Sequence, residues 1–196
     1  MLTTISQEEF FGGPPPQPTP DQARRCLMTP WIDLASLLRL CDLHRPSRFL
    51  EVGCHRGATT LFLAEAFPEM AIVVCDPGDS VPPPDRNQVQ RNEYLPQASL
   101  GELVRGRENV SIHRCGFEDL PVAGKFDGLF IDGDHRFEAV KADTARALSM
   151  RGSHGFIAWH DVGNEPTPEV ELALASLGLP IVKIEGTWLA YLQTAR

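Results

Sequence analysis

The stretch Phe49-Leu50-Glu51-Val52-Gly53-Cys54-His55-Arg56-Gly57-Ala58-Thr59-Thr60 places a short apolar run directly before two glycines and a helix-forming segment. Glycine adopts positive φ angles readily and lets another group approach its backbone closely. The helix that follows turns its free N–H groups and the positive end of its dipole toward the loop. Such a strand–loop–helix unit is typical of nucleotide or nucleoside binding on an open parallel sheet, although a tight βα turn without a ligand also favours glycine.

A second strand is predicted over residues 71–76, and it ends at Asp76, 19 residues after Gly57. In dinucleotide-binding folds an acid about 20 residues beyond the glycine loop accepts hydrogen bonds from ribose hydroxyls. The alternative is an aspartate that caps the Pro77-Gly78 turn. The order of strand, glycines and acid favours the ribose role. The third glycine of the dinucleotide pattern is missing, because the loop reads G-x-x-x-G, and Arg56 suits a carboxylate as well as a phosphate.

Strand and helix patterns alternate along most of the chain. Helices are predicted over 31–44, 58–67, within 88–105, after Asp132 (apolar face Phe137, Val140, Thr144 and Leu148) and from Thr167 to Gly178. Strands are predicted over 48–53, 71–76, 110–114, 125–132, 155–160, 181–184 and 187–192. This alternation predicts an α/β, Rossmann-like open sheet, mostly parallel, with helices on both faces. The last two strands are joined too closely for a crossover, so they are expected to form an antiparallel hairpin.

The length of 196 residues predicts one domain, over residues 31–196. Residues 1–30, with the run Gly12-Gly13-Pro14-Pro15-Pro16, show little periodicity and are expected to form a flexible or capping arm. Two readings of this arm stay open: a tail, or a segment that closes over the cofactor or substrate.

The formal net charge of −8 argues against nucleic acid or an anionic membrane surface as a partner. No apolar run approaches the roughly 20 residues of a membrane span, and no signal peptide is recognised, so a cytoplasmic protein is expected. The five cysteines are scattered without C-x-x-C spacing, which makes a zinc site improbable. Whether the chain forms a homo-oligomer is left open.

Two sets of residues resemble a known family. Glu51-Val52-Gly53, Gly57, Thr59 and Asp76 look like the cofactor motifs of class I S-adenosylmethionine (SAM) methyltransferases. The segments 131–143 (Ile-Asp-Gly-Asp-His-Arg-Phe-Glu-Ala-Val-Lys-Ala-Asp) and 157–161 (Ile-Ala-Trp-His-Asp) resemble its branch of small O-methyltransferases related to macrolide-sugar and rhamnosyl methyltransferases. The resemblance covers roughly residues 46–192 and implies the class I methyltransferase fold.

The resemblance also implies where the cofactor binds. Glu51 is expected near the amino group of the methionine part. Gly116 and Phe117 are expected near the adenine, although Phe117 also suits the core. The full expected set of cofactor-binding residues is Glu51, Gly53, Arg56, Gly57, Thr59, Asp76, Gly116, Phe117 and Asp132.

The predicted strand ends also carry groups suited to methyl transfer. The reaction needs an acceptor oxygen aligned behind the methyl group and a group that removes or weakens its proton. His135 suits the role of base, and it follows Asp132 by three positions, so both are expected to face one cleft as catalytic residues. Asp132 and Asp161 also suit a hard divalent cation such as Mg²⁺. In the resembled enzymes, acids at these strand ends hold the metal and a histidine placed like His135 is the base. The alternative for both aspartates is capping of the next helix or turn.

This chain departs from the resembled pattern at His160, where a further acid often stands. Asp134 or Asn164 could complete a metal shell, while His160 is expected to lie behind the ligands or to contact substrate, because Mg²⁺ prefers oxygen. The sequence therefore predicts a SAM-dependent O-methyltransferase acting on a small hydroxylated acceptor, of the sugar or secondary-metabolite type. The alternatives are an NAD(P)-dependent oxidoreductase and a non-catalytic nucleoside-binding module.

Overall fold

The computed structural model describes residues 2–26, 29–78 and 99–193, and the elements below belong to these ranges. The strands are β1 (Thr3–Ile5), β2 (Arg48–Val52), β3 (Ala71–Cys75), β4 (Val110–His113), β5 (Phe126–Ile131), β6 (Arg151–Trp159), β7 (Val182–Ile184) and β8 (Ala190–Gln193). The α-helices are α1 (Gln7–Phe11), α2 (Pro20–Arg25), α3 (Trp31–His44), α4 (Ala58–Ala66), α6 (Phe137–Met150) and α7 (Pro168–Ser176). Two short 3₁₀ turns are η2 (Glu102–Val104) and η3 (Phe117–Asp119).

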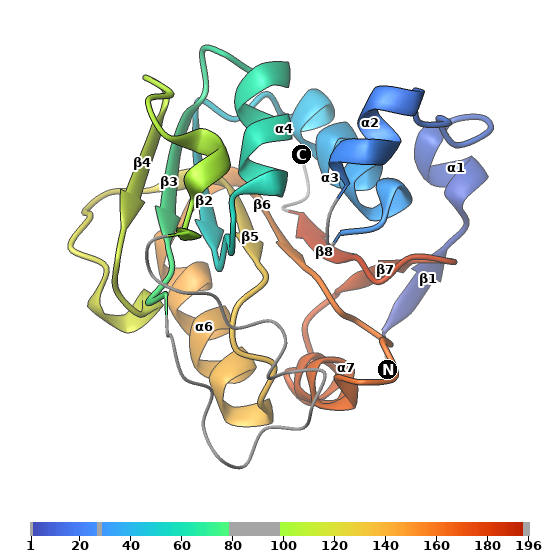
Figure 1. Ribbon diagram of the computed structural model, residues 1–196. Helices are drawn as coiled ribbons and strands as arrows, with labels where there is room; N and C mark the ends of the chain where they lie inside the picture. Colours follow the sequence, from blue (N-terminus) through green and yellow to red (C-terminus); the bar gives the residue numbers. More distant parts are fainter. Residues whose placement is uncertain (1, 27–28, 79–98, 194–196) are drawn as a thin grey trace.

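The strands of the described ranges form one sheet in the order β1-β7-β8-β6-β5-β2-β3-β4 (Figure 1). Every pairing is parallel except those of β8, which runs antiparallel to both β6 and β7. The predicted fold class is confirmed, including the C-terminal hairpin. The reversal of strand order between β5 and β2 opens a crevice at the carboxyl ends of the strands, where ligands bind in such sheets.

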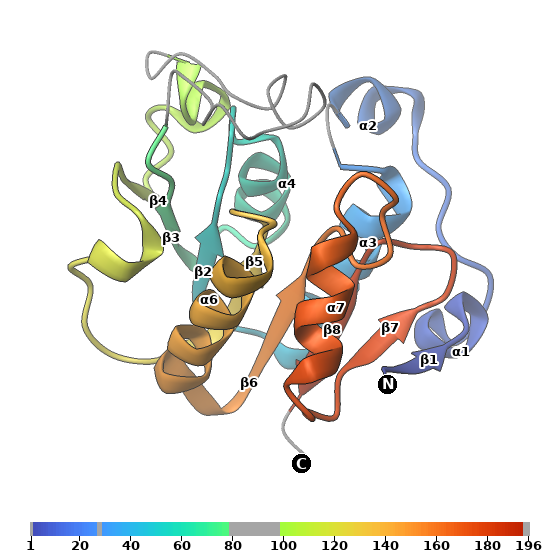
Figure 2. The same cartoon turned by 90° about the horizontal axis from the view of Figure 1, so that it is seen from below.

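Helices cover both faces of the sheet, with α6 and α7 on one face and α3 and α4 on the other (Figures 1 and 2). The alternation of side chains along a strand divides the core accordingly. Leu50 of β2 and Leu129 of β5 pack with residues of α6 and α7. Phe49 and Phe130, their neighbours in sequence, pack with residues of α3 and α4. Because helices bury β2 and β5 on both faces of the sheet, most residues of these two strands are apolar.

The N-terminal arm contributes to the sheet, which the sequence did not indicate. Strand β1 pairs in parallel with β7, with Thr3 opposite Val182. Phe10 is buried, and its ring centroid lies 5.6 Å from that of Tyr191. Trp31 Nε1 donates to the carbonyl of Pro16 at 2.8 Å. A three-residue strand and helices of five and six residues are too short to leave a periodic pattern in the sequence.

The other elements lie close to their predicted positions. Helix α3 has the predicted bounds, and β6 begins at Arg151, earlier than expected, because α6 runs directly into it. Most of the helix predicted within residues 88–105 lies outside the described residues. No helix in the described ranges is both long and apolar enough to cross a bilayer.

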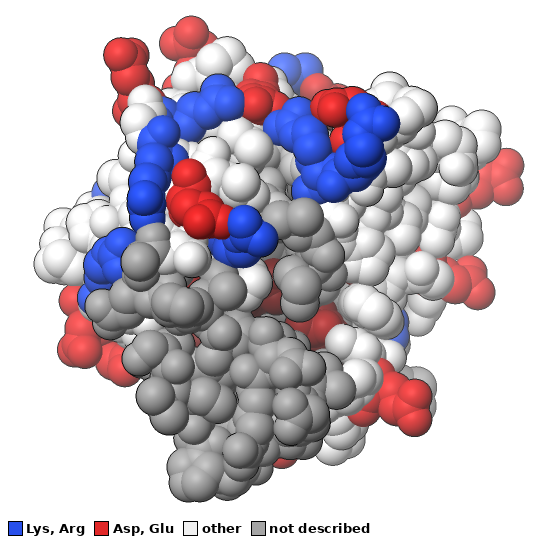
Figure 3. Space-filling view, viewed as in Figure 1, with Lys and Arg blue, Asp and Glu red and all other residues white. Residues whose placement is uncertain are grey.

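Acidic and basic side chains lie side by side on the face shown in Figure 3. Glu65 of α4, for example, accepts from Arg25 at 2.5 Å and from Arg107 at 2.6 Å. Arg25 and Arg107 thus share one carboxylate, that of Glu65. Exposed ion pairs of this kind add little to the free energy of unfolding.

Candidate active site

The glycine loop begins where β2 ends, and its glycines are required by packing within the protein. Gly53 has a φ angle of +82°, and a Cβ atom there would lie 2.2 Å from the carbonyl oxygen of Asp132. Gly57 has a φ of +87°, and its Cβ would lie 3.1 Å from Cγ2 of Val104. A left-handed backbone with such close neighbours strongly favours glycine at Gly53. The G-x-x-x-G pattern is therefore explained by the backbone geometry and packing of the turn, without reference to a ligand.

Asp76 holds this loop in place. Its Oδ2 accepts from the backbone N–H groups of Cys54 and His55, both at 2.9 Å. Its Oδ1 accepts from the N–H of Gly78 at 2.8 Å. The turn-capping alternative is therefore observed. A carboxylate has about four acceptor positions, so one remains for a ribose hydroxyl, and that role stays a prediction.

Glu51 is buried beneath the loop with an exposure of 1%. It accepts a hydrogen bond from the Thr60 hydroxyl at 2.6 Å. Burial raises the pKa of Glu51 to about 8, with smaller contributions from Asp132 and Asp76, while the bond from Thr60 lowers it. The Glu51 carboxyl is therefore largely protonated at neutral pH, which makes it a candidate donor or acceptor toward a polar ligand group.

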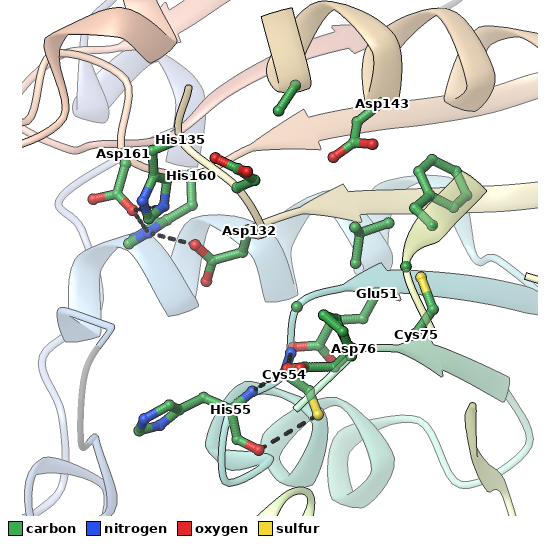
Figure 4. Close-up of a pocket in the computed structure, with 18 of the residues that line it drawn as sticks. Glu51, Cys54, His55, Cys75, Asp76, Asp132, His135, Asp143, His160 and Asp161 are labelled. Carbon is green, nitrogen blue, oxygen red and sulfur yellow. Dashed lines mark hydrogen bonds and ion pairs between the residues drawn. The ribbon is translucent and has the colours of Figure 1, made fainter. Parts of the chain in front are cut away.

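At the neighbouring strand ends, two acids and a histidine converge. Asp132 follows β5, Asp161 follows β6, and these strands are adjacent, as predicted. Ligand atoms of Asp132, His135 and Asp161 all lie within 4.8 Å of one another (Figure 4). His135 Nε2 lies 2.9 Å from Asp161 Oδ2. We call Asp132, His135 and Asp161 the acid–imidazole cluster.

His160 lies behind this cluster and links it to helix α3. Its Nδ1 lies 3.3 Å from both Asp132 Oδ1 and Asp161 Oδ2, and its Nε2 lies 3.0 Å from Asp33 Oδ2. Burial alone would lower the pKa of His160, but the three carboxylates raise it well above its usual value. Burial alone would raise the pKa of Asp161, but His135 and His160 hold it well below its usual range. At neutral pH His160 is thus a buried cation between acids.

The backbone at Asp161 is also unusual, since its φ angle is +59°. A non-glycine residue held in the left-handed region marks a site where surrounding contacts fix the backbone. Asn164 Nδ2 donates to Asp161 Oδ1 at 2.5 Å, and Val162 N donates to the carbonyl of Trp188 at 2.9 Å. The turn after β6 thereby aims the Asp161 carboxylate at His135.

Above the strand ends lies a cavity of about 980 Å³. Its lining includes all the predicted site residues except Gly57: Glu51, Gly53, Arg56, Thr59, Asp76, Gly116, Phe117, Asp132, Asp134, His135, His160, Asp161 and Asn164. Some of these side chains are already engaged: Arg56 pairs with Glu102, and Asp134 pairs with Arg136 at 2.6 Å. Thr59 Oγ1 lies 3.2 Å from Thr29 Oγ1. Phe117 is 3% exposed and belongs to the core, although it also forms part of the cavity wall.

Sequence reasoning missed three lining or supporting residues. Asp33 is 1% exposed, and it falls at helical spacing with Leu37 and Cys41 on the buried face of α3. A charged residue inside an apolar stripe is the signal that could have found it. Asp143 of α6 and Trp188, which precedes β8, line the cavity and carry no comparable local signal.

The sequence comparison agrees with this geometry. A family model described as a methyltransferase domain (methyltransferase 24) matches residues 50–162, more than half of the chain, from within β2 to the turn after β6. The chain belongs to this methyltransferase family. The matched segment contains the glycine loop, Asp76 and the whole acid–imidazole cluster. No curated protein matches the sequence.

Solved structures show the same fold at low sequence identity. The S-adenosylhomocysteine (SAH)-bound methyltransferase PaMTH1 of Podospora anserina has a TM-score of 0.61 and 14% identity, over 91% of this chain and 83% of that one. The O-methyltransferase NovP has a TM-score of 0.59 and 19% identity, over 83% and 79%. The N-methyltransferase NodS of Bradyrhizobium japonicum has a TM-score of 0.57 and 16% identity, over 83% and 94%. These class I methyltransferases share a fold but not an acceptor atom, so the acceptor must be argued from the site.

Proposed function

We propose that this methyltransferase transfers the methyl group of SAM to a hydroxyl of a small acceptor, of the sugar or secondary-metabolite type. The observation that carries the proposal is the single cavity that joins the glycine loop and Asp76 at one end to the acid–imidazole cluster at the other. Membership of the methyltransferase family supports the reaction, and the SAH-bound PaMTH1 and the O-methyltransferase NovP support the cofactor and the acceptor class. Family membership also disfavours the oxidoreductase alternative.

In this proposal the cofactor lies across the carboxyl ends of β5, β2, β3 and β4. Asp76 binds the ribose through its remaining acceptor position. Glu51 and Asp132 lie near the methionine part of the cofactor, where their carboxyl groups can accept hydrogen bonds from its ammonium group. Gly53, Arg56, Gly57 and Thr59 form or support the loop beneath it, and Gly116 and Phe117 lie beyond the ribose.

His135 is the proposed base. Its ring is held by Asp161 at 2.9 Å, and this carboxylate orients the imidazole and stabilises the imidazolium that forms when the acceptor proton is removed. The side chain of His135 is 11% exposed, so the ring faces the cavity with little competing water. His160, paired on both ring nitrogens, positions the two aspartates and takes no part as a base.

The cluster also fits a divalent cation. Asp132 and Asp161 would hold it through carboxylate oxygens, the ligands Mg²⁺ prefers, and a bound cation would lower the pKa of the acceptor hydroxyl. Of the three further candidates, Asp134 is paired with Arg136 and His160 faces carboxylates on both nitrogens. Asn164 uses its amino group on Asp161 and keeps its carbonyl oxygen for a ligand. An Mg²⁺-assisted reaction would therefore involve Asp132, Asp161 and Asn164.

The test is calorimetric titration with SAM, SAH and NAD⁺, each with and without Mg²⁺. We expect the sulfur nucleosides to bind and NAD⁺ not to bind. Asp76→Ala should weaken binding, while Glu138→Ala, which removes an exposed acid from the first turn of α6, should leave SAH affinity intact. Failure of the folded protein to bind SAM or SAH would overturn the proposal. Binding without transfer to any hydroxyl would favour the non-catalytic nucleoside-binding module.

A further inference from the structure

Helix α6 forms one wall of the cavity and places a carboxyl group, Asp143, in it. Among the described residues no hydrogen bond reaches this half-buried side chain. Asp143 lies outside the acid–imidazole cluster (Figure 4), with its Oδ2 3.9 Å from the position that a Cβ of Gly133 would take and close enough to Cys75 of β3 to raise the pKa of that thiol. A carboxyl group held in a cavity without a hydrogen-bond partner costs free energy, which a ligand that bonds to it would recover.

The surroundings of Asp143 favour its neutral form. Four titratable or charged groups face it: Glu118 from η3, Asp134 from the loop after β5, Arg146 from α6, and Cys75 from β3. Burial, with smaller contributions from Glu118 and Asp134, raises the pKa of Asp143 to about 7 against the opposing charge of Arg146. A protonated carboxyl donates one hydrogen bond and accepts another, whereas a carboxylate only accepts.

The order of the strand ends indicates which part of the cofactor lies here. The acid–imidazole cluster stands at β6 and β5, Asp76 at β3, and Gly116 and Phe117 beyond β4. A nucleoside whose reacting end faces His135 and whose ribose binds Asp76 must direct its base past β3. Arg146 lies over the Phe117 ring at 5.2 Å and closes this end of the cavity beside Asp143.

We propose that Asp143 recognises the Watson–Crick edge of the cofactor's adenine, with its carbonyl oxygen accepting from the 6-amino group and its hydroxyl donating to N1. The inference rests on the proposed function, since it assumes a SAM-type cofactor. Adenine offers a donor and an acceptor at adjacent positions, and a neutral carboxyl group matches both. A base without a hydrogen-bond donor at position 6, such as 6-dimethylaminopurine, cannot form the first of these two bonds and is disfavoured.

The experiment compares the binding of SAH and of its N6,N6-dimethyl analogue, which has no donor at position 6, by titration calorimetry. Wild-type protein should bind SAH roughly ten- to hundredfold more tightly than the analogue, the range for one two-bond base contact. Asp143→Ala should lose most of this preference. Asp143→Asn should keep it, because a side-chain amide presents the same donor and acceptor. The wild-type affinity for SAH should fall as the pH rises through about 7, and Asp143→Asn should remove that fall.

Two controls make the outcome specific. Glu138→Ala removes an exposed acid from the first turn of the same helix and should change neither affinity nor preference. Glu118→Ala removes a neighbouring acid that raises the pKa of Asp143, so it is measured well below pH 7, where Asp143 stays protonated, and should leave the preference for SAH in place. Tight SAH binding with a preference that survives Asp143→Ala, or that disappears in Glu118→Ala instead, would overturn the inference alone. Absence of SAH binding by the wild type would overturn the proposed function as well.

Discussion

The two ends of the cavity are built in different ways. At the glycine loop, backbone N–H groups of Cys54 and His55 bind Asp76, within one strand–helix–strand unit. At the acid–imidazole cluster, side chains from the ends of β5 and β6 are joined through His160 to Asp33 on α3, 127 residues away along the chain. The first end depends on backbone geometry, and the second on a network of charged side chains. Substitutions should therefore damage the two ends by different physical routes.

The largest effect is expected where the two ends meet. Gly53→Ala would place a Cβ 2.2 Å from the Asp132 carbonyl oxygen in a left-handed backbone, and should cost about 3 kcal/mol or more of unfolding free energy. Gly106 is the matched control, because its φ is +81° and nothing lies within 4 Å of its Cβ position. Gly106→Ala should cost only about 1 kcal/mol in chemical denaturation. If the two variants lose equal amounts of unfolding free energy, the positive φ angle alone, and not the contact with Asp132, explains the need for glycine at position 53.

The second effect concerns the network. Asp33→Ala removes one partner of a buried ion pair and leaves His160 without its contact on Nε2, so it should cost about 3 kcal/mol. Asp42→Ala on the same helix removes an exposed partner of Arg39 and Arg45 and should stay within about 0.5 kcal/mol. Chemical denaturation of both variants measures the difference. If Asp33→Ala lowers the free energy of unfolding no more than Asp42→Ala does, then the charged network does not stabilise the acid–imidazole end of the cavity, and the contrast with the glycine loop fails.

These two ends also differ in how well the sequence predicted them. The glycines, Glu51 and Asp76 stand in a local pattern of strand, loop and helix, so their positions followed from spacing. The neighbouring positions of Asp132 and Asp161 followed from the expected adjacency of their strands. Asp33 and Asp143 could not be placed, because their partners are set by how α3 and α6 pack on the sheet. The arm's β1 was missed because its stability comes from pairing with β7, far along the chain.

A pH-dependent effect, spread over several pH units, is expected at the loop end. The pKa of Glu51 in the folded protein, about 8, lies above its ordinary value of 4.5, so its contribution to stability is complete below pH 4.5 and is lost as the pH rises through 8. The loss should approach about 1.4 kcal/mol per pH unit within that window. Glu51→Gln should remove this slope, and Thr60→Val, which deletes a bond that lowers the pKa of Glu51, should extend it to higher pH. Denaturation midpoints from pH 5 to pH 9 measure it, and an unchanged slope in Glu51→Gln would contradict the assignment.

The most direct test of the central claim is transfer of labelled methyl groups from SAM to a panel of small hydroxylated acceptors by wild-type protein and by His135→Ala, with SAH affinity measured in parallel. The account predicts labelled product with the wild type, and a rate lowered about 100-fold or more in His135→Ala, the usual contribution of a general base. SAH affinity should be unchanged in the variant. Transfer by His135→Ala at the wild-type rate would contradict the role of the acid–imidazole cluster.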